Sequence, residues 1–99
     1  IHDPVNNDLF ADPPAHGFDD AQIKGFRVPL DGTVAGDCFR ENKAQIIYDV
    51  DNDDRAAKEN LSALGVKNGL CTPLIVVRRD EETGKVLEQR TIGVLYVFN

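Results

Sequence analysis

The sequence predicts an α+β fold in which a central antiparallel β-sheet carries helices on its faces. The apolar run Gly69–Arg78 is followed by a turn-rich segment and then by Arg90–Phe98, a second largely apolar run, and this order predicts an antiparallel hairpin. Apolar residues recur at helical spacing within 34–39 and 57–64, which predicts two helices. Because both strands are apolar on both faces, we expect the hairpin in the middle of a sheet that is covered on both sides.

The N-terminal part of the chain offers few apolar residues to a core. Residues 1–24 combine proline and glycine with Asp and Asn, so we expect an irregular segment with a short strand or one helical turn at Asn7–Ala11. A short helix is expected within Phe18–Lys24, since aspartates favour a helix N-terminus. Gly25–Leu30 alternates apolar with polar residues and predicts a short strand, which Pro29 restricts to a sheet edge.

A short helix and a strand follow this edge strand with almost no loop between them. Asp31 and Thr33 are both candidate caps for a helix whose apolar face includes Val34 and Phe39. The segment Gln45–Val50 is a compact apolar strand.

The acidic segment Asp49–Asp54 has two interpretations. A loop of carboxylates suits a hard cation such as calcium, but this loop lacks the glycine and glutamate positions of an EF-hand. Alternatively, Asp53 or Asp54 caps an amphipathic helix that packs on the sheet and ends at Gly65. We favour the cap and predict no metal site.

Size and charge limit the classes of function. The chain has 99 residues, one domain at most, with 17 acidic and 11 basic residues. This negative excess disfavours nucleic-acid binding, which normally needs a basic patch. No run is long and apolar enough to cross a bilayer, so we expect a soluble, cytoplasmic domain without membrane contact. The chain opens on Ile1 rather than Met, which indicates an excised or processed piece.

The cysteines and histidines indicate little reactive chemistry. Cys38 and Cys71 are the only cysteines, and their apolar neighbours favour buried thiols in a reducing compartment over a single disulfide. His2 and His16 lie in the proline-rich N-terminal segment without a second ligand at metal spacing. We therefore expect both histidines to be exposed to solvent.

Three segments carry a resemblance to a known family: GTVAGDCFRENKAQIIYDVDNDDR, LGVKNGLCTPLIVV and IGVLYVFN. In this order they are similar to the middle and end of a GAF domain, a small-molecule sensing module of signalling proteins, and the similarity spans Leu30–Asn99. Single pieces such as Pro-Leu occur by chance in many sheets, so the resemblance depends on order and spacing. The matching positions are Gly32, Gly36, Asp49, Val50, Asp54, Arg55, Pro73, Leu74 and Ile92 to Leu95. The two glycines stand one residue further apart than in the family pattern.

The resemblance implies a regulatory role. Residues 1–99 are expected to form a single GAF-like domain that is incomplete at both ends, since the first helix and the C-terminal linker helix of the family are missing. Such a domain is a non-catalytic sensor within a larger cytoplasmic signalling protein. It implies an unidentified small-molecule ligand, an unknown cofactor, an effector domain in the parent chain and a homodimer, with no nucleic acid and no membrane as partners.

A ligand pocket of this family is expected between the sheet and the helices, with apolar walls and a few polar groups. Tyr48, Thr72 and Arg55 are the polar candidates, and each has a structural alternative: sheet packing for Tyr48, a β-branched strand position for Thr72, and a surface ion pair with Asp51 for Arg55. The predicted ligand-binding residues are Phe39, Tyr48, Arg55, Leu61, Leu64 and Thr72.

Two other functions compete with the sensor. One is a structural or dimerisation module whose cavity is collapsed and binds nothing. The other is the free methionine sulfoxide reductase branch of the same fold, but Cys38 and Cys71 do not match its cysteine positions and lack an electropositive setting. Neither the Cys-His pair of bilin-binding relatives nor the full Asn-Lys-Phe-Asp-Glu signature of cyclic-nucleotide relatives is present. We therefore predict no catalytic residue.

Overall fold

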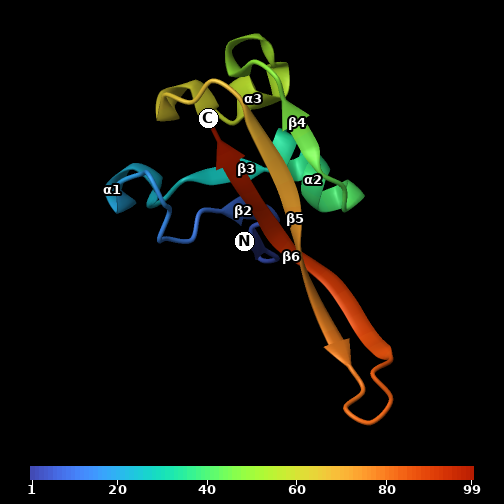
Figure 1. Ribbon diagram of the computed structural model, residues 1–99. Helices are drawn as coiled ribbons and strands as arrows, with labels where there is room; N and C mark the ends of the chain where they lie inside the picture. The colour runs from blue at the N-terminus through green and yellow to red at the C-terminus, as the bar shows by residue number, and fades with distance from the viewer.

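The computed structural model describes residues 1–99 and shows an α+β fold with two three-stranded antiparallel sheets (Figure 1). The predicted α+β class is thus confirmed. In chain order the elements are β1 (His2–Asp3), β2 (Asp8–Phe10), α1 (Asp20–Ile23), β3 (Arg27–Pro29), α2 (Val34–Glu41), β4 (Gln45–Ile47), the 3₁₀ helix η1 (Val50–Asn52), α3 (Asp54–Lys58), the 3₁₀ helix η2 (Leu61–Leu64), β5 (Gly69–Arg79) and β6 (Val86–Phe98).

The first sheet has the order β1-β2-β3 and is built from the N-terminal part of the chain. Leu9 of β2 pairs with Val28 of β3, and both side chains are buried. The predicted edge strand is confirmed, because β3 lies at one end of this sheet and Pro29 stands at its last position. The segment 1–24 contains β1, β2 and α1, and its strand-or-helix alternative at Asn7–Ala11 is resolved as a strand.

The second sheet has the order β4-β5-β6 and contains the predicted hairpin. Cys71 of β5 pairs with Gln45 of β4 on one side and with Tyr96 of β6 on the other. The last strand begins at Val86, earlier than the predicted start at Arg90, because residues beside the turn continue the ladder with Arg78 and Arg79.

The expected place of the hairpin in the middle of a doubly covered sheet is wrong. β6 is an edge strand, and β4 covers only the first residues of β5. The outer half of the hairpin extends away from the rest of the molecule (Figure 1). Its apolar residues are therefore exposed, for example Val77 at 41% and Leu87 at 55%.

Helix α2 begins at the cap that the sequence indicated. The Thr33 hydroxyl accepts a hydrogen bond from Gly36 N–H at 2.9 Å and donates to the Pro29 carbonyl at 2.6 Å. A Cβ atom at Gly36 would lie 1.8 Å from the Leu30 carbonyl oxygen. Only glycine therefore lets α2 approach the end of β3 this closely.

The predicted helix between Asp53 and Gly65 is divided into α3 and η2. Asp53 caps α3 by accepting hydrogen bonds from Arg55 N–H and Ala56 N–H, which confirms one of the two proposed caps. Asn60 has φ 58°, in the left-handed region, and this residue breaks the helix. Gly65 ends η2 with φ 73°, as its identity predicts.

The core lies where α2 meets both sheets. Leu61, Val34 and Ile47 are its largest fully buried side chains. The remaining members of this cluster are Leu9, Val28, Ala35, Cys38, Val50, Ala56 and Cys71. None of the helices combines the length and apolar character needed to span a bilayer.

Candidate functional site

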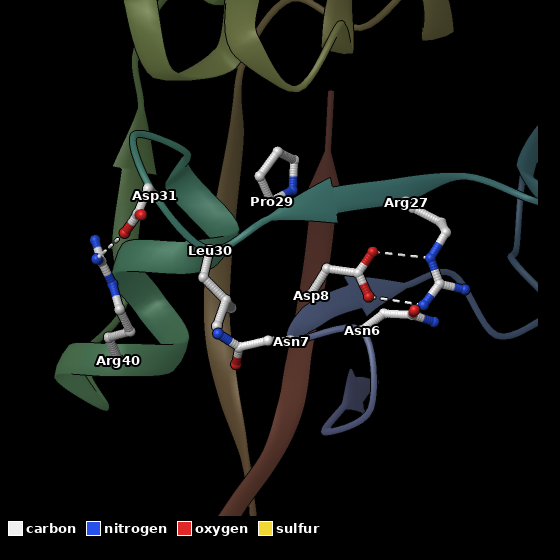
Figure 2. Close-up of a pocket in the computed structure, with 8 residues that line it drawn as sticks. All are labelled: Asn6, Asn7, Asp8, Arg27, Pro29, Leu30, Asp31 and Arg40. Atoms are coloured by element: carbon white, nitrogen blue, oxygen red, sulfur yellow. Dashed lines mark hydrogen bonds and ion pairs between the residues drawn. The ribbon is translucent and has the colours of Figure 1, made fainter.

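A hollow of about 580 Å³, which we call the polar groove, lies between the first sheet and α2 (Figure 2). Figure 2 shows two ion pairs at its ends, with Leu30 and Asn7 between them. The lining residues are Asn6, Asn7, Asp8, Arg27, Pro29, Leu30, Asp31 and Arg40. The groove is thus polar at both ends and has a short apolar stretch in its middle.

At one end of the polar groove, Arg27 forms ion pairs with two carboxylates. Its Nη2 donates to Asp3 Oδ2 at 2.6 Å and to Asp8 Oδ1 at 2.7 Å, and its Nε donates to Asp8 Oδ2 at 2.8 Å. Hydrogen bonds from Asn6 and Arg27 lower the pKa of Asp3 to about 2. The guanidinium of Arg27 also lowers the pKa of Asp8. Both carboxylates are consequently ionised at neutral pH.

At the other end of the groove, Arg40 of α2 also forms ion pairs with two carboxylates. Its Nη1 donates to Asp31 Oδ1 at 2.7 Å, and its Nη2 donates to Asp37 Oδ1 at 2.8 Å, one turn earlier on the helix. The side chain of Asp31 is 88% exposed and has no other hydrogen-bond partner. Asp31 is therefore the most accessible carboxylate of the groove.

The ion pair at Arg40 continues away from the groove as a chain of charged contacts. Asp37 Oδ2 accepts a hydrogen bond from Arg55 Nη1 at 3.1 Å, and the same nitrogen donates to Gln45 Oε1 at 2.9 Å. Arg55 Nε lies 3.7 Å from Asp53 Oδ1. The partners of Arg55 are therefore Asp37 and Asp53, and the sequence-based alternative of a pair with Asp51 is wrong.

The middle of the groove presents one free amide. Asn7 lies in the turn between β1 and β2 with φ 53°, and its side chain makes no hydrogen bond within the chain. Pro29, the last residue of β3, and Leu30, which follows it, supply the apolar surface beside it. The groove thus offers an amide donor and acceptor next to a small apolar floor.

The open charge of the groove is negative. Two carboxylates and two guanidiniums line it, Asp8 and Asp31 with Arg27 and Arg40. Every guanidinium in this set is already paired, whereas the Asp31 carboxylate is largely open to solvent. The arrangement can accept a hydrogen bond from an amine or ammonium group, and it disfavours a phosphate.

The six sequence-predicted ligand residues do not line the polar groove. Leu61 is fully buried in the core, Leu64 packs against that core, and Thr72 is half-buried on β5. Tyr48 is 83% exposed and lines a separate hollow of about 460 Å³ with Ile46, Leu70 and Val97. The ligand-binding role of these residues stays a prediction.

Phe39 has a partner that the sequence did not indicate. The ring of His2 stacks on Phe39 with the ring centroids 4.5 Å apart, so the expectation that His2 is exposed to solvent is wrong. The contact forms because β1 brings His2 against α2. His16 is exposed, as expected.

Glu59 is a buried carboxylate that the sequence analysis missed. It is 3% exposed, and it accepts hydrogen bonds from Val34 N–H at 2.8 Å and from the Tyr96 hydroxyl at 2.5 Å. Burial raises the pKa of Glu59. The buried residues here are Ala56 and Glu59, three positions apart, whereas the apolar spacing had placed Ala57 on the buried face and Ala57 is exposed.

The two cysteines are buried free thiols, as predicted. Burial raises the pKa of Cys38 and of Cys71. Neither thiol is therefore set up to ionise near neutral pH.

The acidic segment performs the capping role that we favoured for it. Asp49 accepts from Asp51 N–H at the start of η1, and Asp53 caps α3. No group of three or more His, Cys, Asp or Glu side chains is placed to hold a metal ion.

The sequence could have indicated parts of the groove. Asp37 and Arg40 stand at an i, i+3 spacing on α2, which predicts their ion pair. The approach of Asp8 to Arg27 depends on the pairing of β2 with β3, so no local pattern reveals it.

The chain matches the model of a known protein family. The family model described as GAF domain matches residues 3–99. A search of curated proteins gave no match.

Proposed function

The chain belongs to the GAF domain family, whose members are generally regulatory modules that bind small molecules, and on this premise we propose that its polar groove binds a small amine or zwitterion. The protein would be the sensory module of a larger cytoplasmic signalling protein and would pass ligand binding to an effector domain. The resemblance noted from the sequence is thus confirmed at the level of the family. The identity of the ligand class is our inference from the groove.

The exposed Asp31 carboxylate is the observation that carries this proposal. An ammonium group placed beside Asp31 would make a charge-assisted hydrogen bond, which is stronger than a neutral one. A carbonyl or carboxylate of the same ligand would reach the free amide of Asn7. Leu30 and Pro29 would cover a short carbon chain between the two polar groups.

The chain of ion pairs supplies a route from the groove to α3. A ligand that binds Asp31 would displace it from Arg40, which otherwise contacts two carboxylates. Arg40 and Arg55 share Asp37, so a change at Arg40 alters the balance of contacts at Arg55, whose backbone lies in α3. A shift of this kind needs a difference in ligand affinity between two conformations, commonly about 1–3 kcal/mol.

Isothermal titration calorimetry of the purified chain with lysine, arginine and inorganic phosphate tests this function, with glycine betaine as a control because its quaternary ammonium group has no N–H to donate. We expect an amine to bind and phosphate to give no heat. Asp31→Asn should weaken binding of that amine by about tenfold, since it removes a charge-assisted bond. Asp51→Asn is the matched control, because Asp51 is exposed and lies in η1 outside the groove. Unchanged affinity in Asp31→Asn, or binding of phosphate alone, would contradict the proposal.

We propose a non-catalytic role. The buried cysteines support it, because a nucleophilic thiol needs access and a stabilised thiolate. Both cysteines are fully buried and have raised pKa values. Sulfoxide reduction by the wild-type chain that is lost in Cys71→Ser would contradict this role.

A further inference from the structure

The buried carboxylate of Glu59 lies between α3 and the start of α2. Its Oε2 accepts a hydrogen bond from Val34 N–H at 2.8 Å, and its Oε1 accepts one from the Tyr96 hydroxyl at 2.5 Å. Val34 is the first residue of α2 and is fully buried, so Glu59 supplies an acceptor that this helix N-terminus cannot obtain from water. Because the first N–H groups of a helix favour negative charge, this hydrogen bond is strongest when Glu59 is ionised.

The same end of α3 also contacts the loop that precedes α2. We call residues 30–33 the Asp31 loop. The Lys58 side chain lies across Gly32 of this loop, since a Cβ atom on Gly32 would stand 2.8 Å from Lys58 Nζ. Gly32 has φ 72°, in the left-handed region that favours glycine. Lys58 and Glu59 therefore contact the Asp31 loop and the first residue of α2 side by side.

The Asp31 loop and α2 together form one end of the polar groove. Figure 2 shows the Asp31 carboxylate reaching from the loop to Arg40 on α2, with Asp31 Oδ1 2.7 Å from Arg40 Nη1. In the chain, Val34 lies between these two partners. A helix moves as a rigid element, so a shift at Val34 is carried to Arg40, about 9 Å further along the axis. The way in which Asp31 and Arg40 meet therefore depends on how the start of α2 is held.

The ionisable groups that face Glu59 are Tyr96 of β6, Cys71 of β5 and Asp53 at the start of α3. From α2 it is faced by backbone N–H groups, and no ammonium or guanidinium group pairs with it. Burial opposes the ionised form more than these hydrogen-bond donors favour it, so the pKa of Glu59 is raised. Glu59 consequently changes its charge at a higher pH than an exposed glutamate does.

We propose that Glu59 is a positioning residue for the polar groove, and that its carboxylate holds the start of α2 and the Asp31 loop in the arrangement that binds an ammonium group. Protonation of Glu59 weakens the bond to Val34 N–H and loosens the loop. An ammonium ligand at Asp31 in turn favours the negative form of Glu59, so ligand binding releases a proton from Glu59 to the solvent. This inference rests on the proposed function for the class of ligand, whereas the link between Glu59 and Asp31 is a property of the chain without ligand.

An NMR titration of the isotope-labelled chain without ligand is the first experiment. The Glu59 carboxyl signal is identified by its loss in Glu59→Gln, and its inflection gives the pH at which Glu59 ionises. We expect the signals of the Asp31 carboxyl and of Arg40 Nε–H to show an inflection at the same pH, although neither group is hydrogen-bonded to Glu59. Glu59→Gln should remove that inflection. Glu81→Gln is the matched control, because it makes the same change at an exposed residue of the β5–β6 turn.

Tyr96→Phe gives a graded version of the test. It removes the hydroxyl that donates to Glu59 Oε1 and keeps the ring in the core, so it disfavours the ionised form of Glu59. We expect the inflections of Asp31 and Arg40 to move to higher pH together with that of Glu59. If Glu59 were only a core residue, its own signal would move and the other two would not. That result, or an inflection that persists in Glu59→Gln, would overturn the proposal.

Addition of lysine distinguishes this inference from the proposed ligand. Lysine should move the shared inflection to lower pH, and its affinity should fall about fivefold as the pH falls through that inflection. A shared inflection in a chain that binds no lysine would support the positioning role and contradict the proposed ligand. Lysine binding that depends on pH as strongly in Glu59→Gln as in wild type would overturn the coupling of Glu59 to the groove.

Discussion

The inner and outer halves of the β5–β6 hairpin both carry apolar residues but lie in opposite environments. In the inner half, Cys71 is fully buried, and Tyr96 packs against the core beneath α2. In the outer half, Ile75 and Val77 are 40% and 41% exposed. The difference lies in what packs on the strands, because β4 pairs only with residues 69–71 of the inner half. An apolar strand is therefore a necessary condition for a core position but not a sufficient one.

Truncations in the core beside the inner half and in the outer half should give the largest contrast in stability. Leu61→Ala should lower the free energy of unfolding by about 3–4 kcal/mol, because it leaves a cavity at a fully buried position. Val77→Ala should lower it by about 0.5 kcal/mol or less when the chain is monomeric. Urea denaturation at low protein concentration measures both values. Equal losses would show that the outer half of the hairpin is packed in solution.

The buried carboxylate of Glu59 should have the next largest effect. Glu59→Ala leaves Val34 N–H and the Tyr96 hydroxyl without a partner inside the core, so we expect a loss of about 2–3 kcal/mol in the free energy of unfolding. Glu59→Gln keeps an acceptor oxygen and should lose less. Thermal or urea unfolding of both variants beside the wild type measures the difference.

The raised pKa of Glu59 also predicts a dependence on pH. The folded chain holds the Glu59 proton to a higher pH than the unfolded chain, whose ordinary value is 4.5. The contribution of this group to stability is therefore largest below pH 4.5 and declines as the pH rises through the folded pKa. The stability of Glu59→Gln relative to wild type should increase over that interval. A constant difference between the two proteins would be inconsistent with a raised pKa.

Asp80, in the turn of the β5–β6 hairpin, should have the smallest effect on global stability. Its Oδ1 accepts hydrogen bonds from Glu82 N–H and Thr83 N–H at 2.9 Å, and the bonds from Thr83 and Glu82 lower its pKa. Asp80→Ala should increase amide exchange in the turn and leave the urea midpoint unchanged. Because the pKa is lowered, the turn should also loosen as the pH falls through the folded value. A changed urea midpoint would show that the turn contributes to the stability of the core.

Much of the fold follows from local patterns in the sequence. The hairpin, the Thr33 and Asp53 caps and the edge position of β3 were all predicted, because turn residues, short polar caps and a strand proline act over a few positions. The break at Asn60 was missed. A left-handed residue within a helical pattern leaves no local signal when it is followed by apolar residues at helical spacing.

The candidate site was less predictable than the fold. The polar groove is formed by residues as far apart as Asp8 and Arg40, and only the pairing of β2 with β3 and the docking of α2 bring them together. Two of the predicted pocket residues, Leu61 and Leu64, followed an apolar helical face, and that face packs in the core. Leu61 illustrates the point, because its helical spacing correctly indicated burial.

The hydrogen bonds of Glu59 have a consequence for the order of folding. The hairpin closes around the short segment 80–85, so the two strands can associate at a small loop-closure cost. Glu59 instead joins residues 25 positions away at Val34 and 37 positions away at Tyr96. Contacts of such separation form late unless they belong to the nucleus. We expect substitutions at Glu59 to accelerate unfolding while refolding stays close to the wild-type rate.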